Sequence, residues 1–161
     1  MQKWTPTEPV KNEIKLKVKT IYLAKERKRV KKVLVMCTGN SCRSIIGEAL
    51  VNKYIDGVKA YSAGVKPTGR VNPNAKKVLE ENGCWDDSYH SKHLDEVLDI
   101  DFDLVVTVCD HAKESCPMFP KPVKKIHVGF EDPDGKGYKE FVKTFNEIKE
   151  TLLPRVKEAL K

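Results

Sequence analysis

The spacing of apolar residues predicts a set of short strands from residue 32 onward. Each run is short, rich in β-branched residues and bounded by polar or turn residues, which is typical of strands buried in a sheet. The predicted strands span residues 33–36, 58–63, 104–108 and 125–128. The run Val33-Leu34-Val35-Met36 is continuously apolar, which is typical of a strand buried in a parallel sheet.

Helical patterns alternate with these strands. Asn72-Pro73 predicts a helix start, as N-cap and first-turn proline, and Asn82-Gly83 predicts its end. Between residues 138 and 160, apolar residues recur every three or four positions, which predicts an amphipathic helix that Pro154 should kink or interrupt. The alternation predicts one α/β domain, a parallel sheet flanked by helices.

The net charge of +7 is concentrated in an N-terminal extension. Residues 1–32 hold 11 Lys and Arg against three Glu, while the remainder holds 19 basic and 20 acidic residues. We therefore divide the chain into a basic extension, residues 1–31, and a nearly neutral catalytic domain, residues 32–161. A solvated charged arm is the expected state of the extension, with polyanion binding as the alternative, and a nucleic-acid partner is not expected.

Composition also indicates a compartment. The chain has neither an apolar run of about 18 residues nor the apolar core of a secretory signal, so we expect a cytoplasmic protein without a membrane partner. Its five cysteines, an odd number, favour thiol chemistry over a disulfide framework.

The loop after the first predicted strand carries the candidate chemistry. Five residues, Gly39 among them, separate Cys37 from Arg43, so the loop must curl and turn backbone N–H groups inward ahead of a helix N-terminus. This predicts an oxyanion cradle that Arg43 closes, in which the Cys37 thiolate is favoured as nucleophile. Ser44, the expected N-cap, can also donate a hydrogen bond to the sulfur. The expected oxyanion-binding residues are Thr38, Gly39, Asn40, Ser41, Cys42 and Arg43.

Residues 37–44, Cys-Thr-Gly-Asn-Ser-Cys-Arg-Ser, resemble the signature loop of thioredoxin-coupled arsenate reductases, which share the low-molecular-weight protein tyrosine phosphatase fold. Other landmarks are similar in the same order over about residues 32–161: Tyr61-Ser62-Ala63-Gly64, Val71-Asn72-Pro73, the segment 103–109, Cys116-Pro117 and Asp132-Pro133. The resemblance implies arsenate as substrate and thioredoxin or a similar dithiol as reductant. It implies Cys37 as nucleophile, Arg43 as anion clamp, Asp132 as general acid, and Cys109 and Cys116 as second and third redox thiols.

Reasoning from the residues supports these roles but leaves alternatives. Asp-Pro is often a simple turn, yet Asp132 follows a predicted strand, where a general acid is needed. Cys109 ends the strand 104–108 and so lies at the sheet edge of Cys37, and Cys116 is close enough in sequence for a disulfide after rearrangement. Inert buried thiols are one alternative for the pair; a zinc site is another, though the close spacing of a zinc knuckle is absent.

A phosphatase is the principal rival function. A low-molecular-weight protein tyrosine or small-molecule phosphatase would use the same loop through a phosphocysteine and needs one reactive cysteine. Asp134-Gly135 stands where phosphatases resembling this fold carry aromatic residues, which favours arsenate reduction.

Other candidate residues receive no catalytic role. We expect Cys42 and Cys84 to be bystander thiols, and the four histidines show no metal-ligand spacing, so no metal site and no tightly bound cofactor is expected. Some relatives bind potassium beside the loop, and three of its ligand positions match here, while the fourth falls at His93, with Asp95 as a nearby substitute. The three matching residues are Asn40, Glu48 and Ser62.

Overall fold

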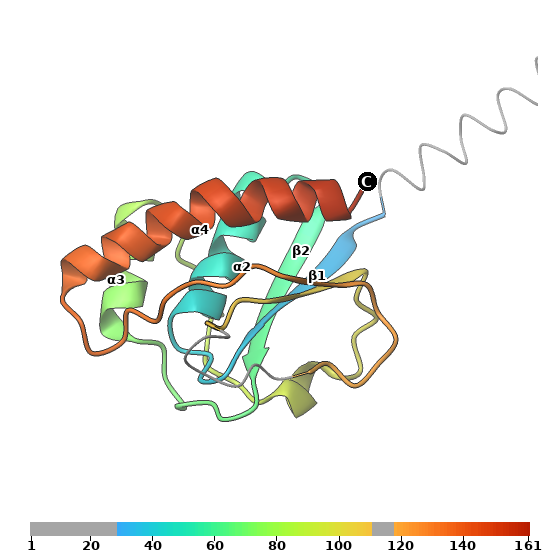
Figure 1. Ribbon diagram of the computed structural model, residues 1–161, viewed down its shortest axis with the longest axis horizontal. Coiled ribbons are helices and arrows are strands. Elements are labelled where there is room, and N and C mark those ends of the chain that lie inside the picture. The colour runs from blue at the N-terminus through green and yellow to red at the C-terminus, as the bar shows by residue number, and fades with distance from the viewer. Residues whose placement is uncertain (1–28, 111–117) are drawn as a thin grey trace, which may run out of the picture. The chain divides into compact units, whose positions relative to one another are not determined.

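A four-stranded, all-parallel sheet forms the centre of the unit Lys31–Lys161. A computed structural model describes residues 29–110 and 118–161. The strand order is β2-β1-β3-β4, with β1 at Lys31–Cys37, β2 at Val58–Gly64, β3 at Leu104–Thr107 and β4 at Lys125–His127. The other elements are α2 (Arg43–Tyr54), α3 (Pro73–Glu81), the 3₁₀ helix η1 (Leu94–Val97) and α4 (Tyr138–Ala159). The predicted α/β class and parallel sheet are confirmed (Figure 1).

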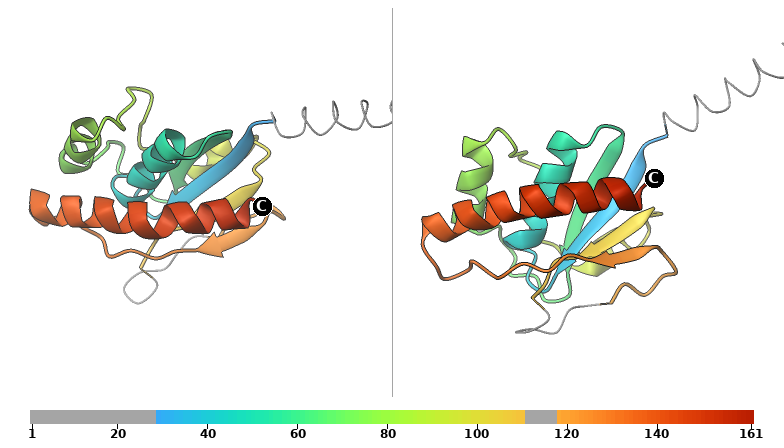
Figure 2. Two further views of the ribbon diagram at one scale, coloured as in Figure 1. Left: turned by 90° about the horizontal axis from the view of Figure 1, so that it is seen from above. Right: turned by 45° about the horizontal axis from the view of Figure 1, so that its top comes forward.

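Strand β1 is central and divides the core between its two faces. Val33, Val35 and Cys37 belong to the cluster that includes α2 and α4 residues, whereas Leu34 and Met36 belong to a smaller cluster on the opposite face. All five are at most 2% exposed, so both faces of the strand are covered, as its continuous apolar run predicted. Figure 2 brings β3 and β4 into view beside β1.

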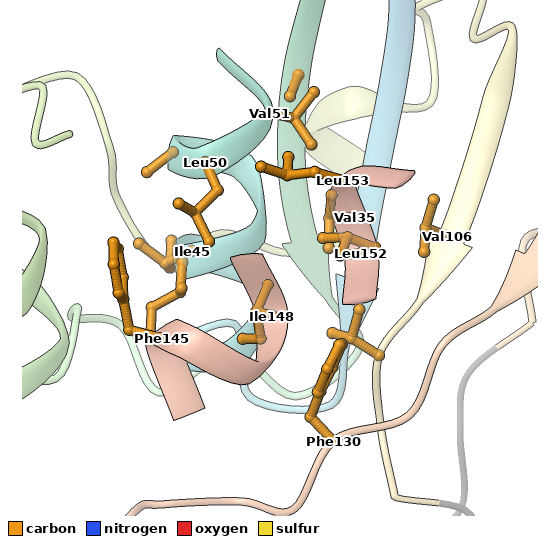
Figure 3. Packing of buried hydrophobic residues seen from close by; sticks show 14 of the residues in the cluster. Val35, Ile45, Leu50, Val51, Val106, Phe130, Phe145, Ile148, Leu152 and Leu153 are labelled. Carbon is orange, nitrogen blue, oxygen red and sulfur yellow. The ribbon is translucent and has the colours of Figure 1, made fainter. Parts of the chain in front are cut away.

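The larger cluster lies between the sheet and helices α2 and α4. Ile148 and Leu152 of α4 pack with Ile45 of α2 and Val35 of β1, as Figure 3 shows. Gly47 permits this approach, because a Cβ there would lie 3.0 Å from Val35 Cγ1 and 3.2 Å from Leu152 Cδ2. Helix α2, which begins right after the candidate loop, is thereby fixed against the central strand.

The smaller cluster contains edge-to-face aromatic contacts. The Phe102 ring lies 5.6 Å from that of Tyr61 and 5.9 Å from that of Phe119, between ring centroids. Leu94 and Val97 of η1 complete this face.

Of two local predictions, the N-cap at Ser44 was wrong, and of the two effects expected of Pro154, a kink or an interruption, the interruption does not occur. Pro154 does not interrupt the last helix: α4 continues through it to Ala159, because buried residues on both sides, including Leu152 and Val156, hold the helix on the core. Ser44 is not an N-cap: α2 begins at Arg43, two residues before the start that a Ser44 cap implies, with Cys42 as N-cap and no side-chain cap. The prediction for α3 is confirmed, since Asn72 caps its first turn by accepting a hydrogen bond from Asn74 N.

Within the two described segments, none of the helices combines the length and the apolar character needed to cross a membrane.

Candidate active site

Cys37 is the last residue of β1, and its sulfur lies beneath a tight loop. The Asn40 backbone N–H donates to Cys37 Sγ at 3.2 Å, and Ser44 Oγ lies 2.9 Å from the same sulfur. Asn40 has a φ of 46°, a left-handed conformation that asparagine tolerates better than most residues. This turn points its N–H back at the sulfur. The side chains of Asn40 and Ser44 are fully buried.

The hydrogen bonds around Ser44 define the direction of its hydroxyl proton. Asn40 Nδ2 donates to Ser44 Oγ at 2.8 Å, and when Cys37 is a thiolate, with no proton to donate, the Ser44 proton points at Cys37 Sγ. The sulfur therefore accepts from a backbone N–H and from a hydroxyl. Both donors stabilise negative charge on the sulfur, as a nucleophilic thiolate requires.

The loop carbonyls are tied to neighbouring segments on one side. Thr38 O accepts from Lys66 N at 3.0 Å, and Gly39 O accepts from Thr68 N at 3.0 Å. Ser41 O accepts from Asn72 N at 2.9 Å. In a trans peptide the N–H of the next residue points opposite to the carbonyl, so the amides after these three carbonyls turn toward the other side of the loop. The Asn40 N–H, which reaches the sulfur, follows this rule. The predicted inward row of amides thus has a structural basis.

The Arg43 guanidinium joins this loop to the segment after β4. It is 4% exposed and donates through Nη1 to the Phe130 carbonyl at 3.1 Å. Its Nη2 lies 3.6 Å from Asp132 Oδ2. The Asp132 carboxylate is 45% exposed and also accepts from the Asp134 backbone N–H at 3.0 Å. The predicted nucleophile, the predicted anion clamp and the predicted general acid therefore meet at one edge of the sheet, where the parallel topology placed them.

These residues surround a cavity of about 260 Å³. Two lining residues, Thr68 and Asp134, had no predicted role. Asp134 accepts from Asn72 Nδ2 at 2.9 Å, and this contact links the wall after β2 to the wall after β4. The cavity lining consists of Cys37, Thr38, Gly39, Asn40, Ser41, Cys42, Arg43, Thr68, Asp132 and Asp134. Every predicted oxyanion-binding residue is in this set.

Because residue 64 is a glycine, the end of β2 lies in direct contact with the loop backbone. It pairs with Cys37 in the sheet, and a Cβ at this position would lie 2.4 Å from the Thr38 carbonyl oxygen and 2.9 Å from that of Cys37. Only glycine permits this approach. The first loop peptide is thus held by contact as well as by hydrogen bonds.

The remaining thiols differ in state. Cys42 is buried, and this burial raises its pKa to about 12, so it stays a neutral thiol beside the cavity. Burial also raises the pKa of Cys84, which donates to Asn82 O at 3.4 Å. Cys109 is fully buried in the cluster that holds Cys37, and it is disulfide-bonded. Cys116 lies outside the described residues.

The residues matched to a potassium site surround a lysine. Ser62 Oγ donates to Glu48 Oε1 at 2.6 Å, and Lys92 Nζ donates to Ser62 O at 2.9 Å. His93, expected as the fourth position, is elsewhere: its ring, 44% exposed, accepts from Asp95 N at 3.0 Å and caps η1. The Asp95 carboxylate, the predicted substitute, is 77% exposed. Lys92 was not singled out in the sequence, where a single lysine between Ser91 and His93 carries no signal.

The comparisons with known proteins agree with this geometry. Residues 32–161 match a family described as low molecular weight phosphotyrosine protein phosphatase. The chain is 45% identical over 133 residues to arsenate reductase 1 of Staphylococcus epidermidis, covering 78% of this chain and 98% of that protein. It is 42% identical over 123 residues to an arsenate reductase of Bacillus cereus, covering 76% and 91%. The crystal structure of an arsenate reductase from Archaeoglobus fulgidus shares 37% identity and a TM-score of 0.68, covering 80% and 98%.

Proposed function

Because this chain belongs to the low molecular weight phosphotyrosine protein phosphatase family, we propose that it uses the family's oxyanion loop to reduce arsenate to arsenite. Relatives more than 40% identical, matched over nearly their whole length, are arsenate reductases. The observation that carries the proposal is that a second cysteine, Cys109, is buried with Cys37 in one cluster and is engaged in a disulfide. A hydrolase needs no such thiol.

The first step is nucleophilic attack by the Cys37 thiolate on arsenic. The loop amides and Arg43 hold the arsenate oxygens, and Asp132 protonates the departing hydroxide. A sulfur–arsenic bond forms and an arsenic–oxygen bond breaks, which leaves a Cys37 thioarsenate adduct with arsenic still pentavalent. Ser44 and Asn40, whose hydrogen bonds reach Cys37 Sγ, stabilise the thiolate before attack.

The second step transfers two electrons to arsenic. The Cys109 thiolate attacks Cys37 Sγ, the sulfur–arsenic bond breaks, and its electron pair leaves with arsenic as arsenite. A Cys37–Cys109 disulfide remains. Cys116 then attacks Cys109, releases the Cys37 thiolate and forms a Cys109–Cys116 disulfide, which an external dithiol such as thioredoxin reduces. In support, Cys37, Cys42 and Cys84 are free while Cys109 is bonded.

The composition of the cavity also favours arsenate over an aryl phosphate. Among the residues that the structure describes, those lining the cavity include no aromatic side chain to stack on a phosphotyrosine ring. The walls at Thr68 and Asp134 are polar and offer no surface on which an aromatic ring could stack.

A coupled assay tests the proposal. Arsenate-dependent NADPH oxidation is measured with thioredoxin and its reductase, beside hydrolysis of p-nitrophenyl phosphate. Wild type should oxidise NADPH in proportion to arsenate, and Cys37→Ser should abolish both reactions. Cys109→Ser should abolish only the reduction, while Cys116→Ser should release one equivalent of arsenite and then stop.

Cys84→Ser is the matched control, because Cys84 is a buried free thiol outside the cavity lining. It should keep both reactions within a few-fold of wild type. Fast phosphate hydrolysis without arsenate-dependent oxidation would instead make the chain a phosphatase. Catalytic arsenite release without any disulfide at Cys109, shown by mass spectrometry, would refute the relay.

A further inference from the structure

Lys92 is a buried cation behind the oxyanion loop. The residue is only 8% exposed, and its Nζ donates to two backbone carbonyls, Ser62 O and His90 O, both at 2.9 Å. A lysine is rarely buried unless its charge is compensated. Here the nearby Glu48, itself 6% exposed, supplies the opposite charge.

The same residue also contacts the loop through its backbone. Lys92 N donates to Asn40 Oδ1 at 2.8 Å, and Lys92 O accepts from Gly64 N at 3.0 Å. The Asn40 side chain is thereby oriented so that its Nδ2 reaches Ser44 Oγ. The Asn40 backbone N–H reaches Cys37 Sγ. A chain of buried hydrogen bonds therefore runs from Lys92 to the nucleophile.

A potassium ion does not fit among these groups. Asn40 Oδ1 accepts from Lys92 N, Glu48 Oε1 accepts from Ser62 Oγ, and Ser62 O accepts from Lys92 Nζ. In each of the three residues expected to supply an oxygen ligand, one oxygen thus already accepts a hydrogen bond. The ammonium would in addition repel a second cation at this position.

We propose that the Lys92 ammonium is a built-in cation that fixes the oxyanion loop, so that this chain needs no added monovalent cation. Lys92 is a positioning residue: it is not among the residues lining the cavity and acts through Asn40 and Glu48. The ammonium neutralises the buried Glu48 carboxylate on α2 and connects the end of β2 to residue 90. This inference rests on the proposed function only for its kinetic readout.

The electrostatic balance agrees with this role. Burial lowers the pKa of Lys92 and raises that of Glu48, while each charge opposes the shift of the other. Removing either charge would leave its partner buried without its strongest opposite charge, which costs more than the pair itself contributes.

The test compares Lys92→Ala with wild type in KCl and in choline chloride at equal ionic strength. Truncation to alanine frees the space of the ammonium, beside Ser62 O and His90 O, for a small cation. In choline, kcat/KM for arsenate should fall at least about tenfold, and about 100 mM KCl or NH₄Cl should restore at least threefold. The thermal midpoint of the variant should rise by about 2 °C or more in KCl, while wild type should not respond.

Lys59→Ala is the matched control. Lys59 also acts on the Glu48 charge, but it is exposed and lies over the Tyr61 ring. It should behave like wild type in both salts. If Lys92→Ala does not fold, Lys92→Met, which removes the charge and keeps the volume, should show the loss of kcat/KM without rescue by KCl.

Three results would overturn the proposal. One is stimulation of wild type more than threefold by KCl; another is a Lys92→Ala variant within twofold of wild type in choline. The third is a Lys92→Ala variant that loses activity, is not restored by KCl or NH₄Cl, and has a thermal midpoint that does not change in KCl. That result would make Lys92 a purely structural residue. Because the midpoint and aryl phosphate hydrolysis do not require arsenate reduction, the cation pattern can hold even if the proposed function fails.

Discussion

Replacing Gly64 by alanine should damage the oxyanion loop more than it destabilises the domain. The new Cβ would lie 2.4 Å from the Thr38 carbonyl oxygen and 2.9 Å from that of Cys37. Ordinary Cβ contacts begin near 3.4 Å, so the Thr38 carbonyl must move by about 1 Å, the difference between 3.4 and 2.4. Both oxygens belong to backbone, so no side-chain rotation relieves the clash.

Two magnitudes follow from this displacement. Overpacking of a close-packed site costs about 1–3 kcal/mol in free energy of unfolding. At about 4 °C per kcal/mol, the thermal midpoint should fall by about 4–12 °C. A misplacement of about 1 Å in a catalytic constellation can cost about 100-fold in rate, so kcat/KM for arsenate should fall by about that factor.

The assay measures kcat/KM and oxyanion affinity at about 15 °C, where the variant remains folded, beside its thermal midpoint. Gly137→Ala is the control, because a Cβ there has no atom within 4 Å; it should cost less than about 1 kcal/mol and leave kcat/KM within twofold. A Gly64→Ala enzyme with a midpoint within 1 °C of wild type and kcat/KM within twofold would refute the argument that contact with Gly64 shapes the loop.

Four further predictions concern the loop and the extension. Ser44→Ala removes a hydrogen bond to a charged sulfur, worth about 1.5–3 kcal/mol, so steady-state kinetics should show kcat/KM about 10- to 150-fold lower, and a loss under threefold would contradict it. Arg43→Lys should weaken phosphate binding in calorimetry and lower kcat/KM by about 100-fold, since an ammonium cannot reproduce the planar fork; near-normal values would exclude the clamp. Because burial raises the pKa of Cys42 to about 12, this thiol is protonated at pH 8, and peptide mapping after iodoacetamide should find Cys37 labelled well before Cys42; equal rates would disprove this. Deleting residues 1–30 should leave kcat within a few-fold, and a collapse in a folded truncation would show that the extension shapes the site.

The strands could be predicted because each combines short length, apolar character and polar boundaries. The apolar side chains from Val33 to Met36 can all be buried only if both faces of the sheet are covered. Strand β1 has this environment. Local signals were less reliable where tertiary contacts compete with them. Pro154 lacks a backbone donor, yet the apolar stripe of α4 keeps the helix continuous. Ser44 has the chemistry of an N-cap, but its hydroxyl is directed to Cys37.

The site residues within the loop could be predicted because the loop is local in sequence. The supporting residues could not, because their roles depend on where distant segments return. Thr68 reaches the loop through its backbone N–H, which carries no sequence signal. Lys92 resembles any surface lysine until its burial and its hydrogen bonds to Ser62 O and His90 O are known, and the adjacent His93 was the more conspicuous residue.

The central position of β1 also sets the order in which the site can form during synthesis. Cys37 and Arg43 emerge early, but the Phe130 carbonyl that holds the guanidinium follows Arg43 by 87 residues. At about 5–20 residues per second, a ribosome needs about 4–17 s to bridge that interval. During this interval the nascent chain contains Cys37 but not the complete sheet and the Phe130 carbonyl that position the loop around it. Strand β1 pairs in parallel with β2 and β3, which both follow it in the sequence. Reactivity toward oxyanions should therefore arise abruptly when the domain is complete. Prematurely terminated chains should not bind arsenate at all.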